Sequence, residues 1–188
     1  RKLLDDHGLS FVKIFASGDL DEYAISELLQ KNAPIDSFGV GTKMGTSADR
    51  PFLDGVYKLC ETQTVAGDFL ATMKLSEGKN TLPGRKQVYR QTDFDGTLKK
   101  DIITLSDEVA EGTPLLVKVI DKGELVYDLP SVKQIRENAK ENLSKLPKPL
   151  RQLVGTHVYP VELSQKLQDL IKKVKTRLTN TEINQNSC

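Results

Sequence analysis

Two short glycine-containing stretches carry the residue types that bind phosphorylated ligands. The first is Ser17-Gly18-Asp19 and the second is Gly39-Val40-Gly41-Thr42. Glycine lets the backbone approach a bound group closely, and exposed amides beside a threonine hydroxyl suit a phosphate. The carboxylate of Asp19 is an acceptor suited to sugar hydroxyls or to a hydrated metal ion. Together these residue types predict a site for a phosphorylated sugar.

The elements expected to position these stretches form a strand–helix–strand unit. An apolar run over residues 11–16 predicts a strand that is buried on both faces. Asp19 and Glu22 have the spacing of a capping box, so we expect a helix over residues 20–31. Residues 35–40 supply the next strand, which completes a right-handed βαβ unit. The two glycine stretches would then meet at the sheet edge where α/β folds bind their ligands.

A purely structural interpretation of the same residues stays open. Gly18, Gly39 and Gly41 would then only form turns, and Asp19 would only cap the helix. Short glycine patterns occur in many proteins that bind no ligand at these positions. The motif by itself therefore does not decide between the two interpretations.

The middle of the chain predicts a different architecture. Short apolar segments alternate with turn residues over residues 55–130, which indicates an antiparallel β-rich region distinct from the unit at residues 1–54. Asp121-Lys122-Gly123 predicts a hairpin turn. The expected strands are residues 56–60, 69–75, 87–90, 101–105, 115–120 and 125–127.

Two helices are expected over residues 131–179. Ser131 and Gln134 have capping-box spacing at the start of a helix that ends near Lys145. A second, basic amphipathic helix is expected over residues 161–178, with its apolar face packed on the fold. The polar residues 180–188 are expected to form a disordered tail.

The composition excludes some classes of protein. With 27 basic and 26 acidic residues the chain is nearly neutral, so there is no electrostatic case for nucleic acid or a membrane surface. No apolar run approaches the roughly 20 residues of a membrane span. Two cysteines, Cys60 and Cys188, do not indicate a disulfide framework, and this favours a reducing, cytoplasmic setting. A closed α/β barrel needs about 250 residues, more than the 188 present.

Four blocks of sequence, in this order, resemble the carboxyl-terminal part of the nicotinate phosphoribosyltransferase family. They are residues 14–22 (IFASGDLDE), 38–42 (FGVGT), 56–59 (VYKL) and 84–90 (GRKQVYR). The resemblance covers about residues 3–146. It implies the last βα units of an incomplete α/β barrel, followed by a small antiparallel β region and two carboxyl-terminal helices.

The activity implied by the resemblance is the first step of nicotinate salvage toward NAD. The family transfers phosphoribosyl from phosphoribosyl diphosphate to nicotinate, giving nicotinate mononucleotide and pyrophosphate, with ATP as co-substrate and Mg²⁺ assisting. The residues carried over by position are Gly18 and Asp19 for the ribose, Gly39, Gly41 and Thr42 for the 5′-phosphate, and Arg85 and Lys86 as a further anion-binding pair.

The resemblance also implies that the chain is a fragment. The family's catalytic histidine, its nicotinate-binding arginine and an acidic motif all belong to segments that would precede Arg1. The chain would then hold no catalytic residue of its own and would be inactive alone. Its expected partners are the amino-terminal portion of the same enzyme and a second copy, because the family builds its site across a homodimer.

Other functions stay open beside this one. A relative that uses nicotinamide or quinolinate would keep the same sugar-phosphate residues, because the ring pocket lies outside this sequence. A non-catalytic phosphosugar-binding or interaction module is the second class, favoured by the lack of a general acid or base other than Asp19 in the opening motif. A third interpretation is a helical interaction protein that uses the basic helix near the carboxyl end.

Overall fold

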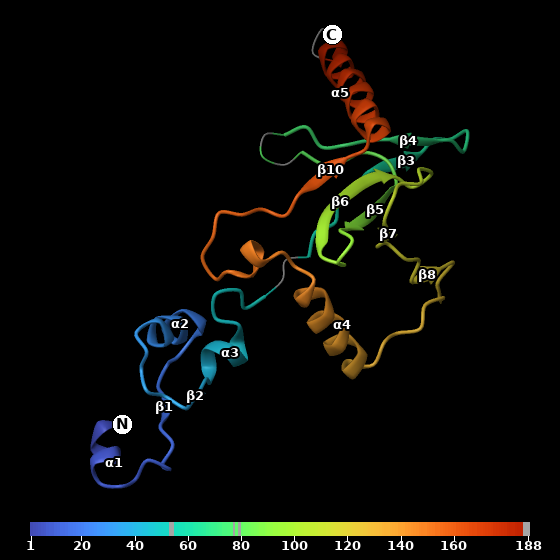
Figure 1. The fold of residues 1–188 in the computed structure, drawn as a ribbon. Coiled ribbons are helices and arrows are strands. Elements are labelled where there is room, and N and C mark those ends of the chain that lie inside the picture. The colour runs from blue at the N-terminus through green and yellow to red at the C-terminus, as the bar shows by residue number, and fades with distance from the viewer. Residues whose placement is uncertain (53–54, 77, 79, 186–188) are drawn as a thin grey trace. The chain divides into compact units, whose positions relative to one another are not determined.

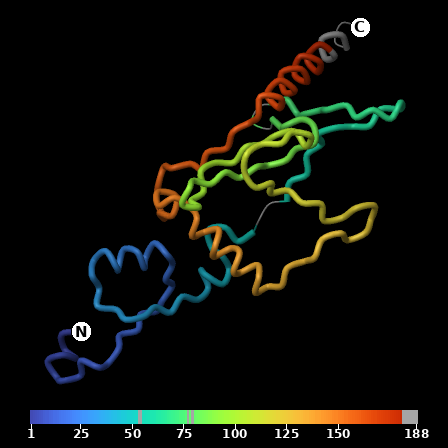
Figure 2. The backbone as a smooth tube through the Cα atoms, turned by 45° about the vertical axis from the view of Figure 1, so that its right-hand side comes forward, coloured from blue at the N-terminus to red at the C-terminus, as the bar shows by residue number. Residues whose placement is uncertain are grey.

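The computed structural model describes residues 1–52, 55–76, 78 and 80–185, with side chains through residue 180. The chain is a mixed α/β protein with small sheets, and it divides into two units, Arg1–Val56 and Tyr57–Cys188. Figure 1 shows the elements of each unit, and Figure 2 follows the backbone through them.

The first unit contains a parallel pair of strands joined by a helix. Strand β1 (Phe15–Ser17) pairs in parallel with β2 (Ser37–Gly39), and α2 (Glu22–Gln30) connects them. A short helix, α1 (Lys2–Asp6), precedes β1, and a second short helix, α3 (Thr42–Thr46), follows β2. The strand–helix–strand order and the parallel pairing expected from the sequence are confirmed.

The helix of this unit begins two residues later than expected. The N-cap of α2 is Asp21, whose Oδ1 accepts a hydrogen bond from the amide of Ala24 at 2.8 Å. Asp19 instead has a φ of 49° and follows Gly18 with a φ of 117°, whereas an N-cap residue needs extended backbone. The predicted capping box of Asp19 and Glu22 is therefore wrong, because a left-handed turn intervenes before the helix starts.

The expected burial of the first strand is also wrong. Phe11 and Phe15 are 75% and 63% exposed, and only residues 15–17 of the run form a strand. The sheet has two strands, and none of the described helices of this unit contains a buried residue. The apolar run thus has no second layer of described structure to pack against.

The second unit is built around a four-stranded sheet with the order β10-β6-β5-β7. Strands β5 (Lys86–Thr92) and β6 (Leu98–Leu105) form its central antiparallel hairpin (Figure 1). The edge strand β7 (Thr113–Pro114) pairs antiparallel with β5. The other edge strand, β10 (Val161–Leu163), pairs in parallel with β6. All strand pairs within residues 55–130 are antiparallel, as the sequence predicts. The parallel strand β10 instead comes from residues that were expected to begin the second helix.

Two further hairpins belong to the same unit. Strand β3 (Glu61–Gln63) pairs with β4 (Phe69–Ala71), and β8 (Ile120–Asp121) pairs with β9 (Glu124–Leu125). Lys122 and Gly123 both have positive φ between β8 and β9, which confirms the predicted hairpin turn.

Two of the expected strands are wrong in most of their length. Residues 56–60 form no strand, and the predicted strand at 115–120 is reduced to Ile120 at its end. Both runs are apolar, but no neighbouring strand supplies a ladder of hydrogen bonds to them within the described residues. At the start of the second run, the Leu115 amide donates to the Val88 carbonyl at 2.8 Å, and the Leu116 amide donates to Oε1 of Gln87 at 2.9 Å.

The helices of the second unit are α4 (Val132–Ser144) and α5 (Gln165–Gln185), and a 3-10 turn, η1 (Lys148–Arg151), follows α4. The capping box of α4, formed by Ser131 and Gln134, is confirmed. No helix in the described part of the chain is long and apolar enough to span a membrane.

Helix α5 packs its apolar face on the fold, as the sequence predicts. Leu167 and Val174 are 0% and 2% exposed, and they form the core together with Met73 and Leu98. The helix continues past the expected end at residue 178 and includes residues 180–185 of the predicted tail. The remaining residues 186–188 of that tail lie outside the described residues.

Candidate functional site

A pocket of about 570 Å³ lies at the carboxyl ends of β1 and β2. Its lining comes from the two loops that follow these parallel strands, as expected of a ligand site in an α/β fold. The lining residues are Ser17, Gly18, Asp19, Leu20, Gly39, Val40, Gly41, Thr42 and Lys43. The structure therefore brings together all five residues that the sequence assigns to ribose and phosphate.

Backbone shape at the two loops explains the glycines. Gly18 has a φ of 117°, which a side chain would make unfavourable. A Cβ at Gly39 would lie 2.7 Å from Cζ of Phe15, on the neighbouring strand. Gly41 is the N-cap of α3, so the backbone amides that begin α3 have no partner within the helix. Free amides beside the Thr42 hydroxyl are the donors that a phosphate requires.

Lys43 is the pocket residue that sequence reasoning missed. Its Nζ lies 2.9 Å from Oδ2 of Asp21 and 3.4 Å from Oδ2 of Asp19, so the ammonium group bridges two carboxylates from the loop that follows β1. The sequence gives little indication of this role. A lysine that follows a glycine–threonine pair can have many roles, and its position beside two acidic residues becomes apparent only in the fold.

The pKa values of this pair reflect their hydrogen bonds. The amide of Ala24, and then the ammonium of Lys43, hold the pKa of Asp21 below its ordinary value. The hydrogen bond with Asp21 raises the pKa of Lys43. Asp21 and Lys43 are therefore both charged throughout the neutral pH range.

Arg85 and Lys86, the predicted anion-binding pair, lie at the start of β5 in the second unit. The Nε of Arg85 donates to Oε1 of Glu61, and its guanidinium lies 4.3 Å from the centre of the Phe69 ring. The Nζ of Lys86 donates to the carbonyl oxygens of Leu82, at 2.9 Å, and Gly84. Both cations thus have protein partners, and their binding of an anion stays a prediction.

A buried polar cluster in the second unit was not expected from the sequence. Two nitrogens of Arg90 donate to the two oxygens of Asp101 at 2.9 and 2.8 Å, and the hydroxyl of Tyr159 donates to Asp101 at 3.0 Å. Asp101 is 8% exposed, and Arg90 holds its pKa below the ordinary value. Burial raises the pKa of Tyr159. The cluster joins β5, β6 and the segment before β10, which is a structural role.

Metal ligands do not gather in the part of the chain that the structure describes. No group of three or more His, Cys, Asp or Glu side chains there is arranged to hold a metal ion. Asp19 in the pocket and Asp21 in the same loop both pair with the ammonium of Lys43.

The fold and the pocket thus define a mixed α/β protein with a glycine-lined pocket at parallel strand ends. Residues 110–171 match the family model described as the nicotinate phosphoribosyltransferase C-terminal domain. Nicotinate phosphoribosyltransferase pncB2 of Mycobacterium tuberculosis strain H37Rv is 40% identical over 169 residues, which are 89% of this chain and 35% of that protein. The Bacillus subtilis nicotinate phosphoribosyltransferase is 34% identical over 209 residues, covering 95% of this chain and 42% of that protein.

A solved structure gives the same match. The crystal structure of human nicotinic acid phosphoribosyltransferase superposes with a TM-score of 0.60 at 25% identity, covering 92% of this chain and 35% of the human chain. The chain belongs to the nicotinate phosphoribosyltransferase family and corresponds to a carboxyl-terminal portion of it. It spans between about a third and two fifths of the length of these relatives.

Proposed function

We propose that this chain supplies the ribose-phosphate-binding part of a nicotinate phosphoribosyltransferase. The enzyme would transfer phosphoribosyl from phosphoribosyl diphosphate to nicotinate, giving nicotinate mononucleotide for NAD salvage. The observation that supports the proposal is the pocket at the ends of β1 and β2. It is lined by all five residues that match the family's sugar-phosphate positions.

Each of these residues has a role in the proposed binding mode. The free amides at Gly41 and Thr42 and the Thr42 hydroxyl would donate to the 5′-phosphate. The Asp19 carboxylate, 81% exposed at the pocket, would accept from ribose hydroxyls. Departure of pyrophosphate builds positive charge on the sugar, so a rigid anchor at the phosphate helps by fixing the reacting carbon in place.

The barrel interpretation belongs to the same proposal. The parallel order β1–α2–β2 is what the last βα units of an α/β barrel contain, and the exposed Phe15 of β1 would be covered by further layers. Those layers would come from the amino-terminal portion of the same enzyme. A second copy completing the site as a homodimer, in the cytoplasm, is part of the proposal.

The proposed reaction also uses Mg²⁺, bound to the diphosphate, and ATP, as a co-substrate. Mg²⁺ would arrive with the diphosphate, since no cluster among the described residues is arranged to hold a metal ion. ATP would act as co-substrate at residues outside the chain. Catalytic acid or base groups would likewise lie in the rest of the enzyme, and the isolated chain would be inactive.

The test is kinetic, on the native enzyme that contains this chain. Asp19→Ala is expected to lower kcat/KM for phosphoribosyl diphosphate about 100-fold, because interactions that fix the reacting sugar act in the transition state. Pyrophosphate release in the presence of nicotinate measures it. Near-normal kinetics for Asp19→Ala would rule out the ribose role. Competition among nicotinate, nicotinamide and quinolinate identifies the ring substrate.

A non-catalytic phosphosugar-binding module is the alternative outcome of the same test. It would bind nicotinate mononucleotide through the pocket but would release no pyrophosphate with any of the three rings. Binding that survives Asp19→Ala and Thr42→Val would contradict both functions, because neither residue would then touch the ligand.

A further inference from the structure

We propose that Lys43 is a positioning residue that makes the pocket prefer a sugar phosphate to free phosphate, because it holds the Asp19 carboxylate at the pocket. The proposal rests on the ribose-phosphate role proposed above for the same pocket. Asp19 and Lys43 both line this pocket, and Asp21 lies behind them in the loop between β1 and α2.

Asp21 is the anchor of the arrangement. One of its oxygens accepts from the Ala24 amide at 2.8 Å and the other accepts from Lys43 at 2.9 Å, and its side chain is 25% exposed. Because its first oxygen caps α2, the carboxylate cannot rotate without breaking the cap. The ammonium of Lys43 is therefore held at a fixed point beside the pocket.

The ammonium of Lys43 in turn orients the carboxylate of Asp19. Its side chain is 81% exposed, and its described contact is the 3.4 Å ion pair with Lys43. An aspartate on an exposed left-handed turn has free rotamers, so a single cation determines where the carboxylate points. The long, exposed pair leaves acceptor capacity on the carboxylate for ligand hydroxyls.

The charges argue against Lys43 as the main ligand of the phosphate. One ammonium group between two carboxylates leaves the trio with a net negative charge, so its attraction for an incoming phosphate is weak. Gly41 and Thr42 line the same pocket and supply uncharged donors for the phosphate. Lys43 therefore acts through Asp19, on the sugar.

Two substitutions with opposite electrostatic effects separate positioning from simple charge. Lys43→Met makes the pocket more negative, and Asp21→Asn makes it less negative. In Asp21→Asn the side-chain oxygen still accepts from the Ala24 amide and preserves the cap. The NH₂ group then faces Lys43, and because it cannot accept a hydrogen bond, the interaction with the ammonium is lost. Calorimetric titration of the native enzyme that contains this chain, with ribose 5-phosphate and with inorganic phosphate, gives the ratio of the two affinities.

If Lys43 positions Asp19, both variants should lower the ratio of the affinity for ribose 5-phosphate to that for inorganic phosphate. The expected decrease is about tenfold, which corresponds to the loss of one charge-assisted hydrogen bond. Lys43→Arg keeps the cation and is expected to retain most of the preference. Opposite changes of the ratio in Lys43→Met and Asp21→Asn would overturn the proposal, because charge alone would then explain them. An equal loss of both affinities in Lys43→Met, with an unchanged ratio, would instead make Lys43 a phosphate ligand.

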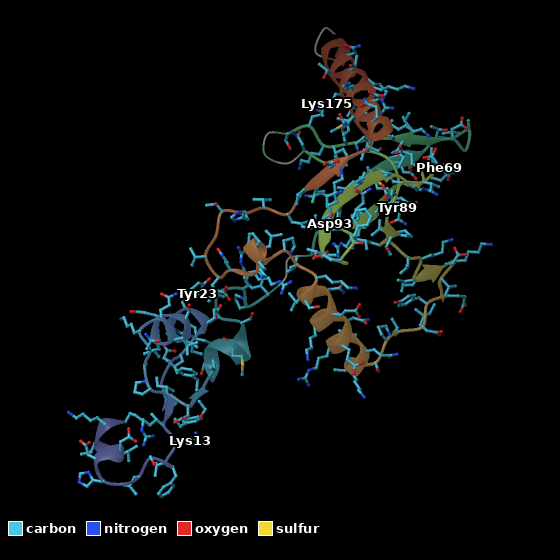
Figure 3. The ribbon with its side chains drawn as sticks, in the orientation of Figure 1. Lys13, Tyr23, Phe69, Tyr89, Asp93 and Lys175 are labelled. Carbon is cyan, nitrogen blue, oxygen red and sulfur yellow. The ribbon has the colours of Figure 1, made fainter. Side chains whose placement is uncertain are left out.

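The chain offers a matched control in the same unit. Lys13 pairs with Asp36 at 3.2 Å, and the other oxygen of Asp36 accepts from the Ile14 amide at 2.7 Å, so this pair is built like that of Lys43 and Asp21. Lys13, labelled in Figure 3, does not line the pocket. Lys13→Met is expected to leave the ratio unchanged. A wild-type enzyme that binds neither probe would refute the proposed function itself, which is a different result from an unchanged ratio.

Discussion

At the scale of single residues, the bridge formed by Lys43 and the cluster around Asp101 have different roles. The Lys43 bridge is exposed beside a pocket, whereas Asp101 is 8% exposed and receives three hydrogen bonds from Arg90 and Tyr159. Bonds to a buried charge contribute to stability, because an unpaired buried charge is costly. Asp101 is therefore the residue at which electrostatics and folding are most closely linked.

Asp101→Asn is expected to lower the free energy of unfolding by about 2 kcal/mol at pH 7, the worth of hydrogen bonds to a charged group. Arg90 holds the pKa of Asp101 below its ordinary value of 3.8. Its stabilisation is therefore complete above that pH and is lost as the pH falls through the folded-state pKa. Urea unfolding followed by circular dichroism should show a difference that shrinks in acid.

The control for this prediction lies on the same hairpin. Asp93, labelled in Figure 3, forms an exposed ion pair with Lys99 at 3.8 Å. Asp93→Asn removes the same charge from the surface and should not change stability measurably. Equal destabilisation by the two substitutions at pH 7, or a constant effect of Asp101→Asn down to acid pH, would refute the buried-pair account.

At the scale of elements, the sequence predicted the capping box of α4 but not the pairing of β10 with β6. Ser131 and Gln134 predict the start of α4 because a capping box is complete within four residues. Strand β10 was missed because three residues become a strand only through pairing with β6, about sixty residues earlier in the chain. In the pocket, the glycine loops were predictable, but the meeting of Lys43 with Asp19 and Asp21 depends on the fold.

The capping box of α4 provides the second prediction. The Ser131 hydroxyl accepts from the Gln134 amide at 3.4 Å, and the Gln134 side chain accepts from the Ser131 amide at 2.8 Å. Ser131→Ala is expected to destabilise α4 by about 1 kcal/mol, seen as faster hydrogen exchange in its first turn. Ser131→Asp should preserve the slow exchange. Unchanged exchange in Ser131→Ala would mean that tertiary contacts hold this helix end.

Pairing of β7 with β5 provides the third prediction. Gly112 precedes β7 with a φ of 119°, and a Cβ there would lie 2.4 Å from the carbonyl oxygen of Arg90. Gly112→Ala combines backbone strain with a clash against backbone and should cost more than about 2 kcal/mol in urea unfolding. Gly96→Ala has a similar φ of 82° in open space and should cost about 1 kcal/mol. Equal costs would show that the close approach to β5 is unimportant.

At the scale of the whole molecule, large apolar side chains are exposed along much of the chain, and nine of them fall within residues 115–129. Between β7 and α4 the chain exposes a run of large apolar residues, and soluble monomers rarely expose contiguous apolar surface of this kind without a partner. The exposed residues are Leu115, Leu116, Val117, Val119, Ile120, Leu125, Val126, Tyr127 and Leu129. This run overlaps the segment that matches the family model.

The fourth prediction is that the chain associates through this stretch. Ile120 is 64% exposed in β8, and Ile120→Lys is expected to reduce concentration-dependent association in light scattering. Phe94 is fully exposed but lies alone between Asp93 and Asp95 in the β5–β6 turn, so Phe94→Lys should leave association unchanged. Association that responds only to Phe94→Lys would point to the hairpin tip instead.

The cluster of Arg90, Asp101 and Tyr159 also limits which substitutions can be tolerated during evolution. Loss of Asp101 removes the acceptor of both Arg90 and Tyr159, and loss of either donor removes bonds from the buried carboxylate of Asp101. A single substitution in the cluster would produce a less stable protein, unless the other positions changed at the same time. Across related organisms the three positions should therefore be inherited as a set, with apolar replacements appearing jointly rather than one by one.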